Sequence, residues 1–324
     1  MNRLSLISLL AAGLVPALAT GFAMAEPANV TDFPLAERIA AKVAAGEELM
    51  IFVSYQDVAN EFAPQIRAGV ERGDALDGVT ATFIGPVGSD ADAQINEIEA
   101  LFDTMDGLAI SSVSTDALAP LIERVLAAGI PVVTYNTDNP DTERLAFAGQ
   151  DLVQSGREAG KLMCDILGSG QIMILTGDAA AQWSLDRESG AREALAACPS
   201  IEVVQTVNTS FDPQEMYANI ENAMLGNPGV TGLLSLECCT TPAAGSWVER
   251  NNRIGEVRIV GFDLVDQTVE LVRAGVIQAT IDQAPEAQGF AAVDLLVKFL
   301  NGEDIDNVDT GVGIFTPDNI AELD

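Results

Sequence analysis

The sequence predicts an α/β protein of two doubly wound, Rossmann-like lobes, each built on a parallel sheet. Short apolar runs alternate with amphipathic stretches along the 324-residue chain, and the alternation begins again near its middle. Most of the runs start about 24–31 residues after the one before, close to the length of one strand–helix–strand unit. Most of the runs are largely apolar along their length, which is typical of strands with both faces buried. We therefore expect two parallel sheets with helices on both faces.

The individual elements follow from these runs. Strands are predicted in the first half of the chain at 49–54, 79–84, 107–112, 131–135 and 145–148. The second half has predicted strands at 171–176, 202–207, 230–235, 258–262, 277–281 and near 312–316. Apolar residues with helical spacing predict helices near 62–73, 91–104, 116–128, 151–167, 187–197, 213–225, 241–251, 266–274 and 285–300.

The N-terminal segment 1–25 has the features of a secretory signal peptide. Arg3 precedes an apolar stretch, and small residues ending at Ala25 provide a cleavage site. The stretch is short and interrupted by glycine and proline, which argues against a membrane anchor. We therefore expect export from the cytoplasm, with residues 26–45 forming a helical extension before the first lobe.

Charge and composition exclude several classes of function. The chain has 48 acidic and 16 basic residues, a net charge of −32, and no histidine. This acidity argues against binding nucleic acid or anionic membranes. Without histidine there can be no Ser-His-Asp triad, Cys-His pair or His-ligated zinc, although carboxylate pairs stay possible. We expect no enzyme activity, no metal and no cofactor, and a monomer.

The four cysteines are Cys164, Cys198, Cys238 and Cys239. Export permits disulfides, and the spacing matches no CxxC metal knuckle. We expect Cys164 and Cys198 to pair. Cys238 and Cys239 form either a vicinal disulfide or two buried thiols.

Polar and aromatic side chains follow many of the predicted strands. Open parallel sheets bind ligands at the carboxyl ends of their strands, and two such lobes place the natural site in the cleft between them. The loop VSYQDVANEF, which follows the first strand, combines ring faces with fork-like polar groups. The candidate ligand-binding residues are Tyr55, Asn60, Phe62, Asn136, Trp183, Arg187, Glu237, Asp263 and Gln283.

Several motifs in this order resemble the ribose-binding-like type I family of periplasmic sugar-binding proteins of ABC transporters. They are VSYQDVANEFAPQIRAGVE, GIPVVTYNTD, LAFAGQDLVQSGREAGKLM, RESGAREAL, RIVGFDL and IQATIDQAPEAQGF. The resemblance covers nearly the whole chain after the signal peptide. It implies two lobes that are joined by three crossovers, near 147–150, 282–285 and 308–312, and that close on a ligand. Lobe one would comprise 46–148 plus 284–309, and lobe two 149–283 plus 310–324.

The resemblance assigns the first-lobe contacts residue by residue. Asn60 matches the polar residue of the first loop, and Phe62 the aromatic that follows it. The family often has a second aromatic next, where this chain has Ala63, so Tyr55 or Trp183 would complete the stacking wall. Asn136 matches the Asp or Asn after the fourth strand.

In the second lobe, Arg187, Asp263 and Gln283 match family positions. Two kinds of departure from the family pattern, one of which includes a first-lobe position, point away from ribose. Thr137 and Leu185 occupy positions where ribose binders carry arginine. Glu237 occupies a position where Asn or Asp is usual.

Each assignment has a structural alternative. Asn60 could cap the following helix, and Phe62 could be a hydrophobic staple. Asp263 could cap the helix that begins near Asp266. Gln283 could serve only as a hinge residue, whereas Trp183, in an expected loop, has no structural reason to be there.

The leading hypothesis is a periplasmic protein that captures a sugar, polyol or cyclitol and delivers it to an ABC transporter permease. Asp and Glu accept hydrogen bonds, Arg donates, and Asn and Gln do both, as sugar hydroxyls require. A ligand with an amino group facing Glu237 and Asp263 stays open. The alternatives are a ligand-sensing module for a membrane receptor and a secreted α/β enzyme, against which the missing histidine counts.

Overall fold

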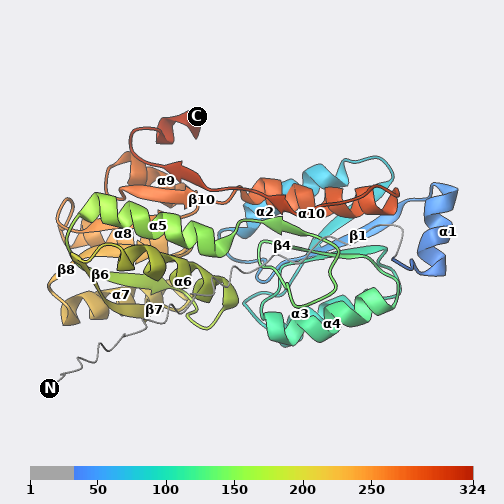
Figure 1. Cartoon of the computed structure of the whole chain (residues 1–324), viewed down its shortest axis with the longest axis horizontal. Coiled ribbons are helices and arrows are strands. Elements are labelled where there is room, and N and C mark those ends of the chain that lie inside the picture. Colours follow the sequence, from blue (N-terminus) through green and yellow to red (C-terminus); the bar gives the residue numbers. More distant parts are fainter. Residues whose placement is uncertain (1–32, 324) are drawn as a thin grey trace, which may run out of the picture.

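The computed structural model describes residues 33–323, so the expected signal peptide lies outside the described part. Two α/β lobes lie end to end, with the N-terminal helix α1 (Glu37–Ala45) at the far end of the first lobe (Figure 1). Each lobe contains a six-stranded sheet, ordered β11-β5-β4-β3-β1-β2 in the first and β12-β10-β9-β8-β6-β7 in the second. The prediction of two doubly wound α/β lobes is confirmed.

The first sheet is covered on both faces. Helices α2 and α10 pack on one face with Ile51 and Val53, and helices α3 and α4 pack on the other with Phe52. Its strands are β1 (Leu49–Ser54), β2 (Val79–Ile84), β3 (Gly107–Ile110), β4 (Val132–Tyr135), β5 (Phe147–Gly149) and β11 (Val308–Asp309). Its helices are α2 (Ala63–Asp74), α3 (Ala91–Ala100), α4 (Thr115–Ala127) and α10 (Pro285–Leu300).

The second sheet repeats this layering. Helices α5 and α6 cover one face, while α7, α8 and α9 cover the other. Its strands are β6 (Gly170–Thr176), β7 (Ile201–Asn208), β8 (Val230–Ser235), β9 (Arg258–Phe262), β10 (Ala279–Asp282) and β12 (Gly313–Phe315). Its helices are α5 (Leu152–Leu167), α6 (Gln182–Ala196), α7 (Pro213–Gly226), α8 (Thr240–Arg250) and α9 (Asp266–Arg273), and the 3-10 helix Ile320–Leu323 ends the described chain.

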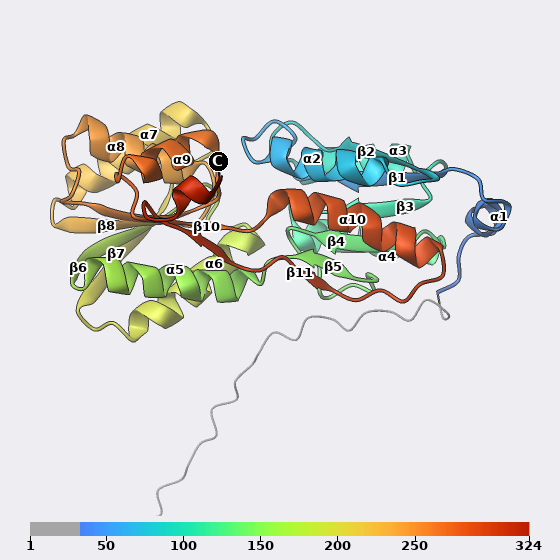
Figure 2. The ribbon, with the colours of Figure 1, turned by 90° about the horizontal axis from the view of Figure 1, so that it is seen from above.

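The chain passes between the two sheets three times: from β5 to α5, from β10 to α10, and from β11 to β12 (Figure 2). Two buried glutamines tie these segments together. Gln150 Nε2 donates to the carbonyls of Asp282 (3.3 Å) and Gly311 (2.8 Å). Gln288 Nε2 donates to Gln283 O (2.8 Å) and Thr310 Oγ1 (3.3 Å). The three crossing segments therefore form one hydrogen-bonded hinge.

The lobes also touch beside the hinge. Gln65 Nε2 on α2 donates to the carbonyl of Leu264 in the second lobe (3.2 Å). Cys238 and Val265, both from the second lobe, belong to the same apolar cluster as Phe62. The lobes are thus in contact beside the crossing segments.

Glycines allow one pair of helices in each lobe to pack in close contact. A Cβ on Gly69 of α2 would lie 2.0 Å from Glu286 O of α10, and one on Gly289 of α10 would lie 2.2 Å from Ile66 O of α2. In the second lobe a Cβ on Gly156 of α5 would lie 2.0 Å from the carbonyl oxygen of Arg187 of α6. No side chain fits at these contacts, so α2 and α10, and likewise α5 and α6, pack backbone against backbone.

Two features differ from the predicted elements. Helix α6 begins at Gln182, not near 187, so Trp183 lies in its first turn and not in a loop. The N-cap residue Ala181 makes no side-chain cap hydrogen bond, which leaves this helix start without its usual sequence signal. The second sheet is also not wholly parallel, because β12 runs antiparallel to β10.

Within residues 33–323, none of the helices has both the length and the apolar character that crossing a bilayer requires.

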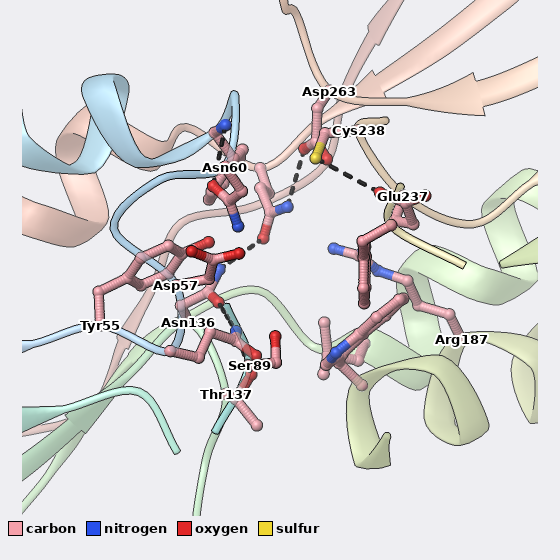
Figure 3. A pocket seen from close by; sticks show the side chains of 16 residues that line it. Tyr55, Asp57, Asn60, Ser89, Asn136, Thr137, Arg187, Glu237, Cys238 and Asp263 are labelled. Atoms are coloured by element: carbon pink, nitrogen blue, oxygen red, sulfur yellow. Dashed lines mark hydrogen bonds between the residues drawn. The ribbon is translucent and has the colours of Figure 1, made fainter. Parts of the chain in front are cut away.

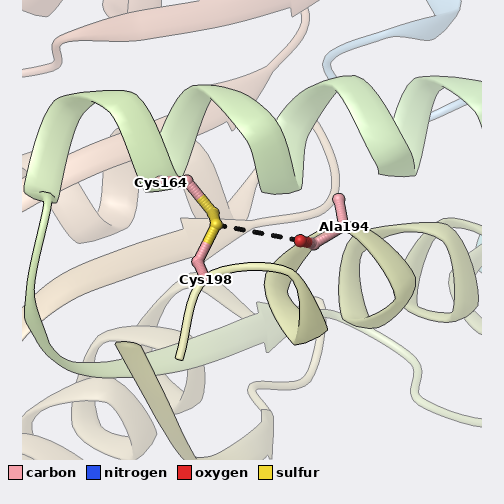
Figure 4. Close-up of a disulfide and its surroundings, with 3 residues drawn as sticks. All are labelled: Cys164, Ala194 and Cys198. Carbon is pink, nitrogen blue, oxygen red and sulfur yellow. Dashed lines mark hydrogen bonds between the residues drawn. A yellow bond between two sulfur atoms is a disulfide. The ribbon is translucent and has the colours of Figure 1, made fainter. Parts of the chain in front are cut away.

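A disulfide joins Cys164 on α5 to Cys198, which follows α6 (Figure 4). It is the pair that the sequence pointed to, and it joins two residues that lie 34 positions apart. Crosslinking a loop of this size contributes about 3–4 kcal/mol by restricting the unfolded chain.

Replacing both Cys164 and Cys198 by serine should therefore lower the free energy of unfolding by about 2–4 kcal/mol. Guanidinium denaturation of the variant and of the wild type measures this difference. A Cys238→Ser/Cys239→Ser variant is the matched control for loss of two sulfur atoms. Equal midpoints for the wild type and the Cys164/Cys198 variant would show that the disulfide does not stabilise the lobe.

Candidate functional site

A cavity of about 560 Å³, including its open mouth, lies between the lobes at the carboxyl ends of the strands. All nine candidate residues line it, and they come from both lobes and from the hinge (Figure 3). The complete lining is Tyr55, Gln56, Asp57, Asn60, Phe62, Ser89, Asn136, Thr137, Leu152, Trp183, Arg187, Phe211, Glu237, Cys238, Asp263 and Gln283.

Aromatic rings form the first-lobe wall. The ring centroid of Tyr55 lies 6.4 Å from Phe62, 5.9 Å from Phe83 and 6.4 Å from Tyr135. Burial raises the pKa of Tyr55 well above its ordinary value, so this phenol stays protonated. Ala63 is fully buried and belongs to the same core cluster. Tyr55 therefore supplies the ring beside Phe62 at the cavity wall.

Hydrogen bonds fix the loop that carries these rings. Asn60 Oδ1 accepts from the backbone N–H groups of Phe62 (3.1 Å) and Ala63 (2.9 Å), at the start of α2. Asp57 Oδ1 accepts from Ala59 N (3.0 Å) and from Gly88 N (2.9 Å) in the loop after β2. The side chain of Asn60 thus has the structural role that the sequence left open, while it also lines the cavity.

A chain of side-chain hydrogen bonds crosses from one lobe to the other. Gln56 Nε2 donates to Asn136 Oδ1 (3.1 Å). Asn136 Nδ2 donates to Gln283 Oε1 (3.2 Å) and to Gln288 Oε1 (3.0 Å). Gln283 Nε2 then donates to Asp263 Oδ1 (2.8 Å) in the second lobe. Gln283 is therefore both a hinge residue and a cavity residue.

The backbone is left-handed at two residues of this chain, Asn136 and Asp263. Asn136 has φ 58° and Asp263 has φ 69°, and Asn and Asp are the side chains that tolerate this conformation best. Asp263 does not cap α9, because the N-cap of that helix is Val265 and no side chain caps it. The left-handed turns direct both side chains into the cavity wall.

Arg187 lies one turn after Trp183 on α6, so that both side chains reach the cavity. Its Nη1 donates to Leu236 O (2.8 Å), and its guanidinium carbon lies 4.2 Å from the ring centroid of Phe262. Burial lowers the pKa of Arg187, while the negative charge of Asp263 opposes this effect. Arg187 is the single basic side chain among the lining residues.

Glu237 faces the N-terminus of α8. Its Oε1 accepts from Thr240 N (2.8 Å) and its Oε2 from Cys239 N (2.7 Å). A carboxylate in this position satisfies backbone donors that have no partner within the helix. Glu237 therefore acts as a helix cap as well as a lining residue, a role that the sequence did not suggest.

Seven lining residues were not among the nine candidates: Gln56, Asp57, Ser89, Thr137, Leu152, Phe211 and Cys238. Ser89 and Phe211 lie in the loops after β2 and β7. The rule that selected the other strand ends would have found them, because each lobe sheet places the end of every parallel strand at the same edge.

Burial raises the pKa of Asp263 to about 7, although Arg187 and the hydrogen bond from Gln283 lower it. At pH values between the ordinary pKa of an aspartate and about 7, Asp263 is protonated in the folded protein and ionised in the unfolded chain. The contribution of Asp263 to stability is therefore fully present below about pH 4 and is lost as the pH rises through about 7.

Replacing Asp263 by asparagine should remove this pH dependence. Urea denaturation should be measured at about pH 4.5 and about pH 8, which bracket most of the titration of Asp263. Between these two pH values, the variant should lose less free energy of unfolding than the wild type. Asp165→Asn, at an exposed position on α5, is the control and should follow the wild type. Parallel pH profiles for wild type and Asp263→Asn would contradict the assignment.

Comparison with known proteins gives the family. The profile of the periplasmic binding protein domain matches residues 51–304. The xylose/arabinose-binding protein XylF of Sulfolobus acidocaldarius is 27% identical over 295 residues, covering 84% of this chain and 71% of the relative. The ribose import binding protein RbsB of Bacillus subtilis is 23% identical over 261 residues, covering 80% and 84% of the two chains.

A solved structure shows the same fold. The ABC transporter solute-binding protein of Burkholderia graminis, in complex with D-arabinose, superimposes with a TM-score of 0.81 and 26% identity. The match covers 85% of this chain and 97% of the other. With a family profile that spans most of its length and two lobes meeting at a lined cleft, this chain belongs to the periplasmic binding protein domain family.

Proposed function

We propose that this chain is a monomeric periplasmic protein that captures a sugar, polyol or cyclitol between its lobes and delivers it to the permease of an ABC transporter. The observation that carries the proposal is the interlobe cavity, in which the Asn136–Gln283–Asp263 chain meets the rings of Tyr55 and Phe62. This combination matches a ring with hydroxyl groups around its edge and C–H bonds on its faces.

The polar lining suits hydroxyl groups. Asn and Gln side chains both donate and accept, Asp263 accepts when ionised, and Arg187 donates in a planar fork. Because most of these groups are buried, an analogue that lacks a matching hydroxyl would leave them unpaired, at a cost of about 1–3 kcal/mol for each group. The cavity wall thereby provides specificity without covalent chemistry.

The relatives support carbohydrate as the ligand class, since XylF is named for xylose and arabinose and RbsB for ribose. This chain lacks arginine at the two positions where ribose binders carry it, which favours a ligand other than ribose. Thr137 lines the cavity without a charge, and Leu185 is 47% exposed and lies outside the lining. With Arg187 as the one basic group at the cavity, we favour a neutral polyol, cyclitol or hexose.

Ligand capture would couple to lobe closure. The cavity is lined from both lobes, and Gln283 links it to the hinge. A solute that bonds to both walls stabilises the closed arrangement through its differential affinity for that state.

Thermal shift against pentoses, hexoses, polyols and inositols tests the ligand class. A ligand present at 100 times its Kd adds about 2.7 kcal/mol to the free energy of unfolding, which raises Tm by several degrees. We expect one neutral member of the panel to do so, with one-to-one binding by calorimetry. If none shifts Tm and none binds by calorimetry, the carbohydrate assignment fails.

The two tryptophans give a direct optical test. Trp183 lines the cavity, whereas Trp247 is buried in the core of the second lobe. Ligand should therefore change the intrinsic fluorescence of the wild type and of Trp247→Phe. It should produce no change in Trp183→Phe, whose affinity calorimetry can still report. A signal that disappears only in Trp247→Phe would place the ligand elsewhere.

A further inference from the structure

Three adjacent side chains at the end of β8 bring soft and hard metal ligands together. The Sγ atoms of Cys238 and Cys239 lie 3.0 Å apart, and Cys238 Sγ lies 3.4 Å from Glu237 Oε2. One ligand atom from each of the three residues falls within 4.8 Å of the other two. Glu237 and Cys238 are buried, and Cys239 is half-buried. This cluster lies in the cavity wall through Glu237 and Cys238.

Backbone geometry favours two thiols over a disulfide at this position. Cα atoms joined by a trans peptide are about 3.8 Å apart, whereas disulfides usually join Cα atoms about 4.4–6.8 Å apart. The Cys164–Cys198 disulfide, with Cα atoms 6.2 Å apart, lies within that range. Adjacent cysteines fall outside it, so the Cys238–Cys239 pair remains available as two thiol ligands.

We propose that Glu237, Cys238 and Cys239 bind a thiophilic divalent cation of the Zn²⁺ and Cd²⁺ class. Cysteine sulfur and glutamate oxygen are both ligands of zinc. Binding replaces the two thiol protons, which pass to solvent, by two metal–sulfur bonds, and the carboxylate adds a third bond. No oxidant or reductant is involved.

The surrounding structure prepares this site. The N–H groups of Cys239 and Thr240 already hold the Glu237 carboxylate in place, and each carboxylate oxygen has a further lone pair for a metal. Such outer hydrogen bonds orient metal ligands and strengthen their binding. Asp263 lines the same cavity as Glu237 and Cys238, and its carboxylate adds negative charge to that cavity when it is ionised.

Three protein ligands would leave one position of a tetrahedral zinc ion to a non-protein ligand. Because Cys238 and Glu237 both line the ligand cavity, that position belongs to the same cleft. The proposed cation would share Glu237 and the cavity with the carbohydrate ligand, but none of its three ligands belongs to the Asn136–Gln283–Asp263 chain.

The test uses the full chain after signal-peptide removal, isolated from the periplasm without reductant or chelator. We expect either two titratable thiols per chain or one bound zinc ion by mass spectrometry. After metal removal, Cd²⁺ titration should give one ion per chain and the ultraviolet charge-transfer band of a cadmium–thiolate bond. Calorimetry in parallel gives the Kd.

Removing outer-shell partners of a metal costs about 10–100-fold in affinity, so Cys238→Ser and Cys239→Ser should each lose at least this much. The double variant should lose the thiolate band entirely. Cys164→Ser/Cys198→Ser, which removes the other two sulfur atoms, is the matched control and should bind Cd²⁺ like the wild type.

Two outcomes would overturn the proposal. A chain with no titratable thiol and no metal contains a Cys238–Cys239 disulfide in place of the metal site. Cd²⁺ binding that is unchanged in the Cys238/Cys239 double variant belongs to other carboxylates. Neither result bears on ligand-induced thermal shifts, so failure here and failure of the carbohydrate assignment are distinguishable.

Discussion

The hydrogen-bond chain from Asn136 through Gln283 to Asp263 connects the two lobes through the hinge. Its members are at most 8% exposed, and a buried polar group left without a partner costs about 1–3 kcal/mol. The polar groups of the cavity therefore hold one another in position when the lobes are together. The hydrogen bonds of Gln283 therefore join the shape of the cavity to the relative position of the lobes.

Much of this architecture is predictable because strands buried on both faces leave a strong apolar signal. The runs at 49–54 and 230–235 coincide with the largely buried strands β1 and β8. The predictions that were wrong concern elements for which the sequence carries no local signal. Helix α6 starts at Gln182 with no side-chain cap, and the antiparallel direction of β12 depends on how the third crossing returns, not on its composition.

The position of the candidate site was also predictable, since strand ends meet at one edge of each sheet. The hydrogen-bond partners of individual side-chain atoms were not predictable from the sequence. Asn60 presents Oδ1 to its own backbone, and Glu237 presents both oxygens to the start of α8. Sequence shows that a polar residue follows a strand, but only coordinates show which of its lone pairs are already occupied.

The glycine contacts between helices have a mechanical consequence. Helices α10 and α5 both begin at the hinge, and each is interlocked with a helix that begins at the cavity, α2 and α6 respectively. Because no methyl group fits between the partners, a cavity helix cannot slide against its hinge helix. Each pair therefore packs as one rigid unit, which fixes the position of the cavity residues at the start of α2 and α6 relative to the crossing segments.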